Sequence, residues 1–335
     1  MPIDWDETDS LILVDVDGVL NVGIKEPGTQ SLLLNDTNVA VAHKMLDMSR
    51  RLSASLSEHK VSVLKLAELM KRPLAPGNGK GATYKDLVAA SPSAISDVLV
   101  RNLAKIVDSA GKRCGVVLSS TWRKPQYLAR VRTLESALST HLGRPFTFDD
   151  CTPLIEERDA GDRLKTIRTY LKAALANRVD NPRRLRVLVL DDFSITPCED
   201  WYCMGYAIKS ASDVEKFLSQ ATGGVAMVKL LHTYDTWTGA NGLSMQVGCG
   251  LQQCHVDEAR QFFELAAVTC TVPEEKFLLV SSLLEGRLRG LNATWGIVPL
   301  EKIAAEVRMR KLAGLCVGEA GGAGQKPQIG EYIEV

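Results

Sequence analysis

The chain has 335 residues, of which 45% are hydrophobic and 24% charged, and its formal net charge is zero. This is ordinary globular composition, long enough for one large α/β domain with an insertion or for two domains. A net charge of zero gives no bulk electrostatic reason to expect a nucleic-acid or membrane partner. The acidic first ten residues lack the apolar core of a secretion signal, and no run approaches the roughly 18–20 apolar residues of a membrane span.

The charge is nevertheless unevenly spread. Residues 101–186 carry 18 Lys and Arg against 9 Asp and Glu. Such a basic middle third suits an anionic substrate, and it suits solvated helix faces equally well.

Eight cysteines without a dense framework are typical of reduced thiols, so we expect an intracellular, cytoplasmic protein. Two pairs share the same spacing, Cys198 with Cys203 and Cys249 with Cys254, and His255 follows the second pair. Zinc binding is conceivable there, but the neighbouring Pro and Gly residues favour ordinary loops.

The most informative stretch is LILVDVDGVLN, residues 11–21. Four apolar residues, Leu11–Val14, run straight into Asp15, Asp17 and Gly18. A short apolar run closed by a glycine turn predicts a buried parallel strand that ends in a loop, where open α/β sheets bind ligands. Two converging carboxylates repel each other unless a cation lies between them, and Mg²⁺ is the natural candidate. The alternative is a strand followed by an acidic turn, because DxDG also occurs by chance.

The segment after Asn21 predicts helices. Residues 23–34 are loop-like, and apolar residues then follow helical spacing from near Thr37 to Met70. Pro73 and Pro76 end this run, and a further helix is expected from about 94 to 110.

A second buried-strand pattern covers Gly115–Leu118 and ends in Ser119 and Ser120. A hydroxyl at the end of a parallel strand can donate a hydrogen bond to a phosphate oxygen, and it can instead cap the helix that follows, which includes residues 127–142. Adjacent hydroxyls can divide these two roles.

A third strand pattern, Arg186–Leu190, runs into Asp191 and Asp192. Before it lies an expected helix, capped by Asp162, whose first turn is basic and therefore opposes the helix dipole. That inconsistency indicates an anionic partner or a solvated basic face. Three such strands joined by helices predict a doubly wound, mainly parallel sheet. The predicted edge collects the polar residues that follow the strands: Asp15, Asp17, Ser119, Asp191 and Asp192.

Together these residues resemble the haloacid dehalogenase (HAD) superfamily of phosphohydrolases. Three stretches carry the closer resemblance: DVDGVLN, VLSSTWR and LDDF. They are similar in particular to the HAD domains associated with Swiss-army-knife RNA-repair proteins. Members of this family carry a basic residue before the strand that ends in the last pair of acids, here Arg186–Leu190. Arg163 has the best register for this role and Lys165 the next best. The segment Thr238–Ser244 and a helix from Val256 to Ala266 resemble the end of these domains.

The resemblance implies a HAD-like core over residues 1–22 and 93–267. It places a small helical cap at 23–92 and leaves 268–335 as a partly flexible C-terminal extension. For that extension, a helix packed on the sheet and a partner-binding appendage both remain open.

The resemblance also implies a mechanism. Asp15 would attack a phosphate monoester to form an aspartyl-phosphate, and Asp17 would act as general acid and base. Mg²⁺ would be bound by Asp15, the backbone carbonyl of Asp17, and Asp191 or Asp192, with Asp192 ranked second because it can also act as a capping acid. Ser119 and a basic side chain, Arg163 or Lys165, would hold the phosphoryl oxygens.

The expected partner is therefore a phosphorylated substrate, either a small molecule or a nucleic-acid end, and no membrane. The competing hypothesis is a non-catalytic HAD-like module that binds a phosphorylated partner or RNA. Retention of both Asp15 and Asp17 argues against it, because binding alone needs neither a nucleophile nor a proton donor.

Overall fold

The computed structural model describes residues 3–5, 7–25, 31–51, 58–91, 93–155, 160–176, 185–195, 202–203, 206–223, 226–238 and 244–270. The chain divides into two compact units, Met1–Ala267 and Val268–Val335.

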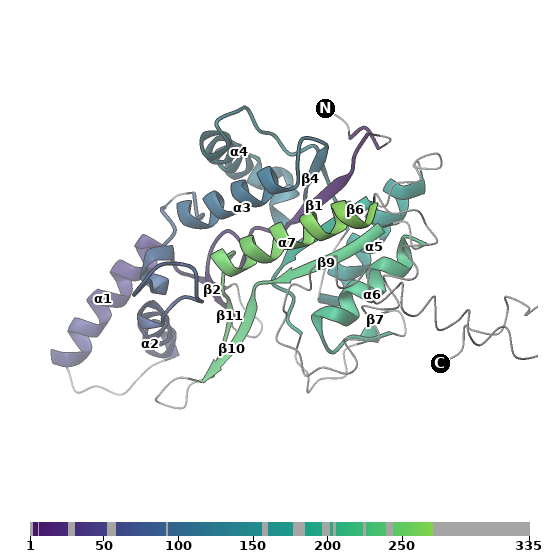
Figure 1. The fold of residues 1–335 in the computed structure, drawn as a ribbon. Helices are drawn as coiled ribbons and strands as arrows, with labels where there is room; N and C mark the ends of the chain where they lie inside the picture. Colours follow the sequence, from purple (N-terminus) through teal and green to yellow (C-terminus); the bar gives the residue numbers. More distant parts are fainter. Residues whose placement is uncertain are drawn as a thin grey trace, which may run out of the picture. The chain divides into compact units, whose positions relative to one another are not determined.

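A five-stranded parallel sheet forms the centre of the first unit, with strand order β5-β4-β1-β6-β9 (Figure 1). Its strands are β1 (Ser10–Val14), β4 (Cys114–Leu118), β5 (Asp150–Cys151), β6 (Leu185–Asp191) and β9 (Ala226–His232). The doubly wound α/β fold expected from the sequence is confirmed. β9 at the edge, like the helix α6 (Ala211–Ala221) before it, was not predicted.

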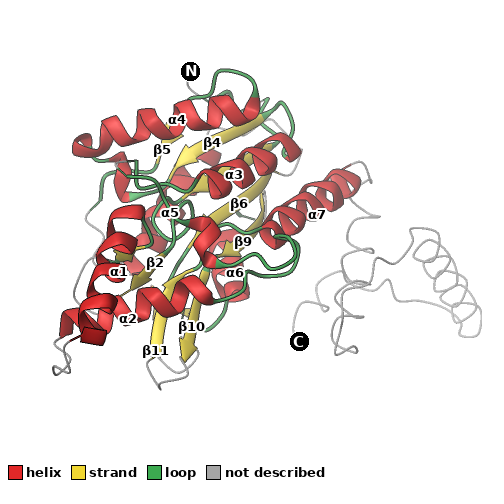
Figure 2. Ribbon diagram, turned by 90° about the vertical axis from the view of Figure 1, so that its left-hand side faces the viewer, coloured by secondary structure: helices red, strands yellow, loops and turns green. Residues whose placement is uncertain are grey.

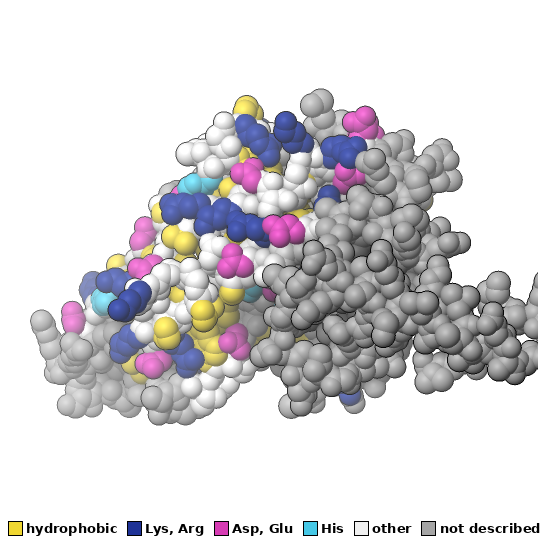
Figure 3. Space-filling model, in the orientation of Figure 1, with side chains coloured by type: hydrophobic (Ala, Val, Ile, Leu, Met, Phe, Trp, Pro, Cys, Tyr) yellow, Lys and Arg dark blue, Asp and Glu magenta, His cyan; other side chains and the backbone are white. Residues whose placement is uncertain are grey.

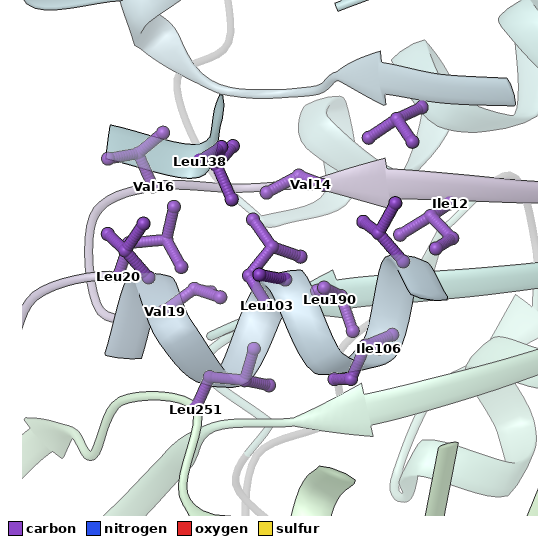
Figure 4. Packing of buried hydrophobic residues seen from close by; sticks show 14 of the residues in the cluster. Ile12, Val14, Val16, Val19, Leu20, Leu103, Ile106, Leu138, Leu190 and Leu251 are labelled. Atoms are coloured by element: carbon purple, nitrogen blue, oxygen red, sulfur yellow. The ribbon is translucent and has the colours of Figure 1, made fainter. Parts of the chain in front are cut away.

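Helices cover both faces of this sheet, which explains why its strands are continuous apolar runs rather than alternating ones. Ile12 and Val14 pack with α3 (Asp97–Ser109), α4 (Leu128–Leu142) and α7 (Gln253–Cys270). Leu11 and Leu13 face the other way, toward α5 (Ala160–Ala176) and α6. Figure 4 shows the first of these two cores, with α3 lying along the sheet beneath Val14 and Leu190.

A second, antiparallel sheet has the strand order β10-β11-β2-β3. It consists of β10 (Tyr234–Thr238), β11 (Ser244–Gly248), β2 (Gly23–Lys25) and β3 (Leu32–Leu33). Thr233 alone separates β9 from β10, so the chain passes almost directly from one sheet to the other. Figure 2 shows β10 and β11 beside α1 and α2.

The segment 23–92, for which we expected a small helical cap, contains strands as well as helices. It contains α1 (Asp36–Arg51), α2 (Glu58–Lys71) and the short 3-10 helix η1 (Tyr84–Leu87), but also β2 and β3. These strands are too short to give a periodic signal, and β2 pairs with β11 far away in sequence. The inner face of the second sheet joins the helices in a third apolar cluster, which includes Ile24, Leu66 and Val247.

Two helix boundaries also differ from expectation. α3 begins at Asp97 rather than near Ala94, because Ala94 has a left-handed φ of 56° and Ser96 is extended. Asp162 lies within the first turn of α5 instead of capping it.

The remaining short elements are the 3-10 helices η2 (Thr121–Arg123) and η3 (Pro125–Tyr127) and the strands β7 (Tyr202–Cys203) and β8 (Tyr206–Ala207). Most of the predicted Thr238–Ser244 motif, and the extension beyond Cys270, lie outside the described residues. Among the described helices, none is long and apolar enough to cross a membrane.

Candidate active site

Three carboxylates meet at the carboxyl edge of the parallel sheet. Asp15 follows β1 and Asp191 ends β6, and these two strands are neighbours, with Val14 opposite Leu190. Asp15, Asp191 and Asp192 each place one carboxylate oxygen within 4.8 Å of the other two. The sequence placed all three residues at this edge, and the strand register brings their side chains together.

Gly18 makes this crowding possible. Its φ is +79°, and a Cβ added there would lie 1.9 Å from Oδ2 of Asp192. A Cβ on Gly248 would likewise lie 2.8 Å from the same oxygen. Both positions therefore require glycine, one of them also because of its backbone conformation. The Gly18 loop is fixed in turn by two donors to its carbonyl, the amide of Gly250 at 3.0 Å and the hydroxyl of Thr233 at 2.9 Å.

Asp17 is held apart from the three-carboxylate cluster by its own hydrogen bonds. The side-chain amide of Asn21 donates to Oδ1 at 3.0 Å, and the indole N–H of Trp122 donates to Oδ2 at 3.2 Å. Asn21 also accepts from the amide of Gly18 at 2.8 Å. Asp15 and Asp17 thus have different surroundings, as two acids with different roles would need.

Arg163, from the first turn of α5, is the cation beside the cluster. Its Nε and Nη2 donate to Oδ2 of Asp191 at 3.1 and 3.0 Å, and Nη2 lies 3.4 Å from Oδ1 of Asp15. Lys165 pairs instead with Asp162 at 2.9 Å, and about half of its side chain is exposed. Of the two basic residues that the sequence left open, only Arg163 touches the carboxylates.

Sequence reasoning missed Lys25, the second cation at the cluster. It is the last residue of β2, and its Nζ lies 2.8 Å from Oδ2 of Asp192 and donates to the backbone carbonyl of the same residue at 2.8 Å. The ring of Tyr234 lies beneath it, with its centroid 5.5 Å from Nζ. No local signal marks Lys25, because its position depends on the pairing of β2 with β11.

The two serines after β4 have different neighbours. The amide of Ser119 donates to the carbonyl of Val14 at 2.7 Å, which places Ser119 next to Asp15 at the sheet edge. Its hydroxyl accepts a long hydrogen bond of 3.5 Å from Thr152. Ser120 is the N-cap of η2, where its hydroxyl accepts from the amide of Trp122 at 3.4 Å. Ser119 therefore adjoins the carboxylates, whereas Ser120 caps a helical turn.

The sequence also matches a family model, described as the HAD domain in Swiss Army Knife RNA repair proteins, over residues 11–212. The chain belongs to this HAD family. No curated protein and no solved structure matches it.

The matched range takes in the four acids, Ser119, Arg163 and Lys25, but it ends before β9. Gly248, Gly250 and Thr233, which hold the Gly18 loop and Asp192 in place, lie beyond the match. The HAD site of this chain is therefore completed by residues from the second sheet and the loop that precedes α7.

The electrostatics of the HAD site are dominated by burial. Burial raises the pKa of Asp191 well above its usual value, and the adjacent charges of Asp15 and Asp192 add to this rise while Arg163 opposes it. Burial raises the pKa of Asp192 to about 7, against the opposing effect of Lys25. The pKa of Asp17 is also raised, first by burial and then by Asp15, while its two hydrogen-bond donors lower it. The charged forms of Asp17, Asp191 and Asp192 are therefore disfavoured unless a cation lies nearby.

This donor set fits a hard divalent cation. Carboxylate oxygens are the ligands that Mg²⁺ prefers, and a cation between Asp15, Asp191 and Asp192 would relieve the repulsion that adds to the burial-raised pKa values of Asp191 and Asp192. Zinc binding by Cys249, Cys254 and His255 is not supported: among the described residues, the three aspartates are the only group of three or more ligand side chains close enough to share an ion. Cys198 lies outside those residues.

Basic residues of the middle third lie both at the carboxylate cluster and on helix surfaces. Arg163 reaches the carboxylates, but other members of the segment lie on helix surfaces, such as Arg101, which pairs with Asp97 at 2.8 Å, and Arg144, which lies 3.8 Å from Asp108. Figure 3 shows Lys and Arg side chains in a row over α3 with Asp and Glu beside them.

A cavity of about 600 Å³ lies elsewhere, beside α2 and β10. Arg72 stacks over Trp237 there, with 4.4 Å between the guanidinium carbon and the ring centroid, and Tyr84 meets the same ring edge-on. None of the four acids lines this cavity. Polar side chains in its wall bond to each other or to backbone, as Gln252 does with Tyr84 at 2.9 Å.

Proposed function

We propose that this protein is a Mg²⁺-dependent phosphatase that hydrolyses a phosphate monoester through an aspartyl-phosphate on Asp15. Membership of the HAD family supports a phosphohydrolase in general. The observation that carries the finer proposal is the convergence of Asp15, Asp191 and Asp192 with Arg163 at one edge of the sheet, with Asp17 set apart on its own donors.

In the first step, an oxygen of Asp15 attacks phosphorus in line with the leaving oxygen. The bond from phosphorus to the leaving oxygen breaks as the new Asp15–phosphorus bond forms, and protonated Asp17 gives its proton to the leaving oxygen. The raised pKa of Asp17 favours the protonated acid that this step needs. Asn21 and Trp122 keep the carboxyl group oriented.

In the second step, Asp17 takes a proton from water, whose oxygen attacks phosphorus and releases Asp15 as a carboxylate with free phosphate. Arg163 and Ser119 would hold phosphoryl oxygens during both transfers, where charge develops. Asp15, Asp191 or Asp192, and the carbonyl of Asp17 would hold Mg²⁺, which would supply positive charge between the attacking carboxylate and the phosphate.

The test compares wild type with Asp15→Asn on p-nitrophenyl phosphate, with Mg²⁺ and with a chelator. We expect the variant to lose on the order of 10³-fold or more in kcat, because the nucleophile is gone. Asp257→Asn, an exposed acid on α7, is the matched control and should keep full activity. After acid quenching, mass spectrometry should find phosphate on the Asp15 peptide of wild type only. Equal activity of Asp15→Asn and wild type would exclude Asp15 as nucleophile.

The substrate belongs to one of two classes, small phosphorylated metabolites or phosphorylated nucleic-acid ends. The description of the family as RNA-repair HAD domains favours the second class. Turnover of 3′- and 5′-phosphorylated oligonucleotides, compared with that of sugar phosphates and nucleotides, separates them. Tight RNA binding with no turnover in Mg²⁺ would favour the non-catalytic module instead.

A further inference from the structure

Three polar residues form a row across the second sheet. In the strand register, Gln246 of β11 stands opposite Lys25 of β2 on one side and Thr236 of β10 on the other. Directly opposite residues on adjacent antiparallel strands project to the same face, with Cβ atoms about 4.5–5.5 Å apart. We call Lys25, Gln246 and Thr236 the polar row.

The polar row lies on the catalytic side of the sheet. Gly248 is two residues beyond Gln246 and so faces the same way, and a Cβ added to it would meet Asp192 at 2.8 Å. Lys25 itself contacts Asp192 at 2.8 Å. The alternate residues, Ile24 and Val247, face the opposite way into the third apolar cluster. The row therefore continues outward from the carboxylate cluster along an accessible sheet face.

The outer part of the row has unused hydrogen-bonding groups. Within the described part of the chain, neither the side-chain amide of Gln246 nor the hydroxyl of Thr236 has a hydrogen-bond partner. Gln246 is half-buried and Thr236 exposed. Tyr234, which stands opposite Gly248 in the next row of the sheet, adds an aromatic ring nearer the carboxylates, under the ammonium of Lys25.

We propose that the polar row is the subsite for the alcohol part of the substrate and that it takes a sugar bearing the phosphate. This inference rests on the proposed phosphatase function. An amide, a hydroxyl and an ammonium beside one another offer both donors and acceptors, which match the adjacent hydroxyls of a sugar. A plain aryl group would leave these donors and acceptors unmatched, so the row acts as a specificity determinant rather than as part of the phosphoryl-transfer machinery.

The test uses Gln246→Leu and Thr236→Val, which keep approximate side-chain size and remove the polar groups. Steady-state kinetics with ribose 5-phosphate and p-nitrophenyl phosphate give the ratio of their kcat/KM values. We expect each variant to lower that ratio roughly 3–10-fold, through a higher KM for the sugar phosphate, as the loss of one hydrogen bond does. Ser244→Ala, one row farther out opposite Thr238, is the matched control and should leave the ratio unchanged.

An unchanged ratio in both variants would overturn the inference, and so would equal losses on the two substrates. If wild type hydrolyses neither these two compounds nor the phosphorylated oligonucleotides, the phosphatase proposal fails by itself, and calorimetric titration of ribose 5-phosphate against wild type and Gln246→Leu still tests the subsite. Equal affinities in that titration would overturn the inference. Repeating the comparison with a 5′-phosphorylated dinucleotide distinguishes a free sugar phosphate from a nucleic-acid end as the source of the sugar.

Discussion

At the scale of single residues, the orientation of α5 decides which of two nearby basic side chains, Arg163 or Lys165, reaches the carboxylate cluster. Arg163 and Lys165 are two residues apart in α5, so their side chains leave the helix on different faces. Arg163 is buried against Asp15 and Asp191, while Lys165 reaches Asp162 at the surface. Because Arg163 lies beside Asp15, the proposed nucleophile, we expect Arg163 rather than Lys165 to stabilise charge on a transferring phosphoryl group.

The two basic residues should therefore respond differently to substitution. Arg163→Gln should lower kcat on p-nitrophenyl phosphate by on the order of 10²–10³, as the loss of one oxyanion-stabilising donor does. Lys165→Gln should change it less than about twofold, because exposed ion pairs of this kind contribute little. Steady-state kinetics at saturating Mg²⁺ would measure both. Comparable losses in the two variants would argue against the role given to Arg163.

The buried acids make a prediction about pH. Burial raises the pKa of Asp192 to about 7 in the folded protein, above the value near 4 of an unfolded Asp. Between these values the folded state keeps a proton on Asp192 that the unfolded state has lost, so the stability that Asp192 contributes is fully present below about pH 4 and is lost as pH rises through 7. For the metal-free protein the fall should be on the order of 2–4 kcal/mol.

Thermal or urea unfolding in chelator, from pH 4 to 8, measures this fall. Asp192→Asn should flatten it, whereas the surface variant Asp257→Asn should leave it unchanged. Mg²⁺ should raise the Tm of wild type at neutral pH, because it binds the charged carboxylates of the folded state only. An identical pH profile of stability in wild type and Asp192→Asn would contradict the assignment.

At the scale of elements, the sequence predicted the parts whose signals are local. β1, β4 and β6 are unbroken apolar runs because both faces of the sheet are covered, and the acids at their ends follow from strand polarity. β9, with the pattern AMVKLLH, has three half-buried side chains and a Lys, so it lacks that signal. The second sheet was missed for a different reason, because β2 and β3 have only three and two residues.

The site residues differ in the same way: some follow strands with a local sequence signal, and others are placed by long-range contacts. Asp15, Asp17, Ser119 and Asp191 follow or end recognisable strands, so the sequence was enough to predict their place at the sheet edge. Lys25 belongs to a strand that exists only through its pairing with β11, and nothing in the sequence around it marks that pairing. The choice between Arg163 and Lys165 likewise needed the orientation of α5 against the sheet. Long-range contacts, rather than residue identity, were the missing information.

At the scale of the whole molecule, the family match and the folded unit have different ends. The match ends at residue 212, within α6, whereas the compact unit extends to Ala267. The part beyond the match supplies the edge strand β9, two strands of the second sheet and α7. Loops from this part also hold the Gly18 carbonyl, through Thr233 and Gly250. Fold and site both depend on it.

A chain ended after Gly223 should therefore fail to fold, whereas one ended after Cys270 should unfold cooperatively in the same range as the full chain. The shorter chain loses seven large buried apolar side chains: Leu230, Leu231, Met245, Val247, Leu251, Val256 and Phe263. At about 1.5–3 kcal/mol each, their burial matches or exceeds the roughly 5–15 kcal/mol net stability of a domain. Far-UV circular dichroism and urea unfolding of the two truncated chains measure the difference. A soluble, cooperatively unfolding 1–223 chain would show that this segment folds by itself and that β9, β10, β11 and α7 are not needed for folding.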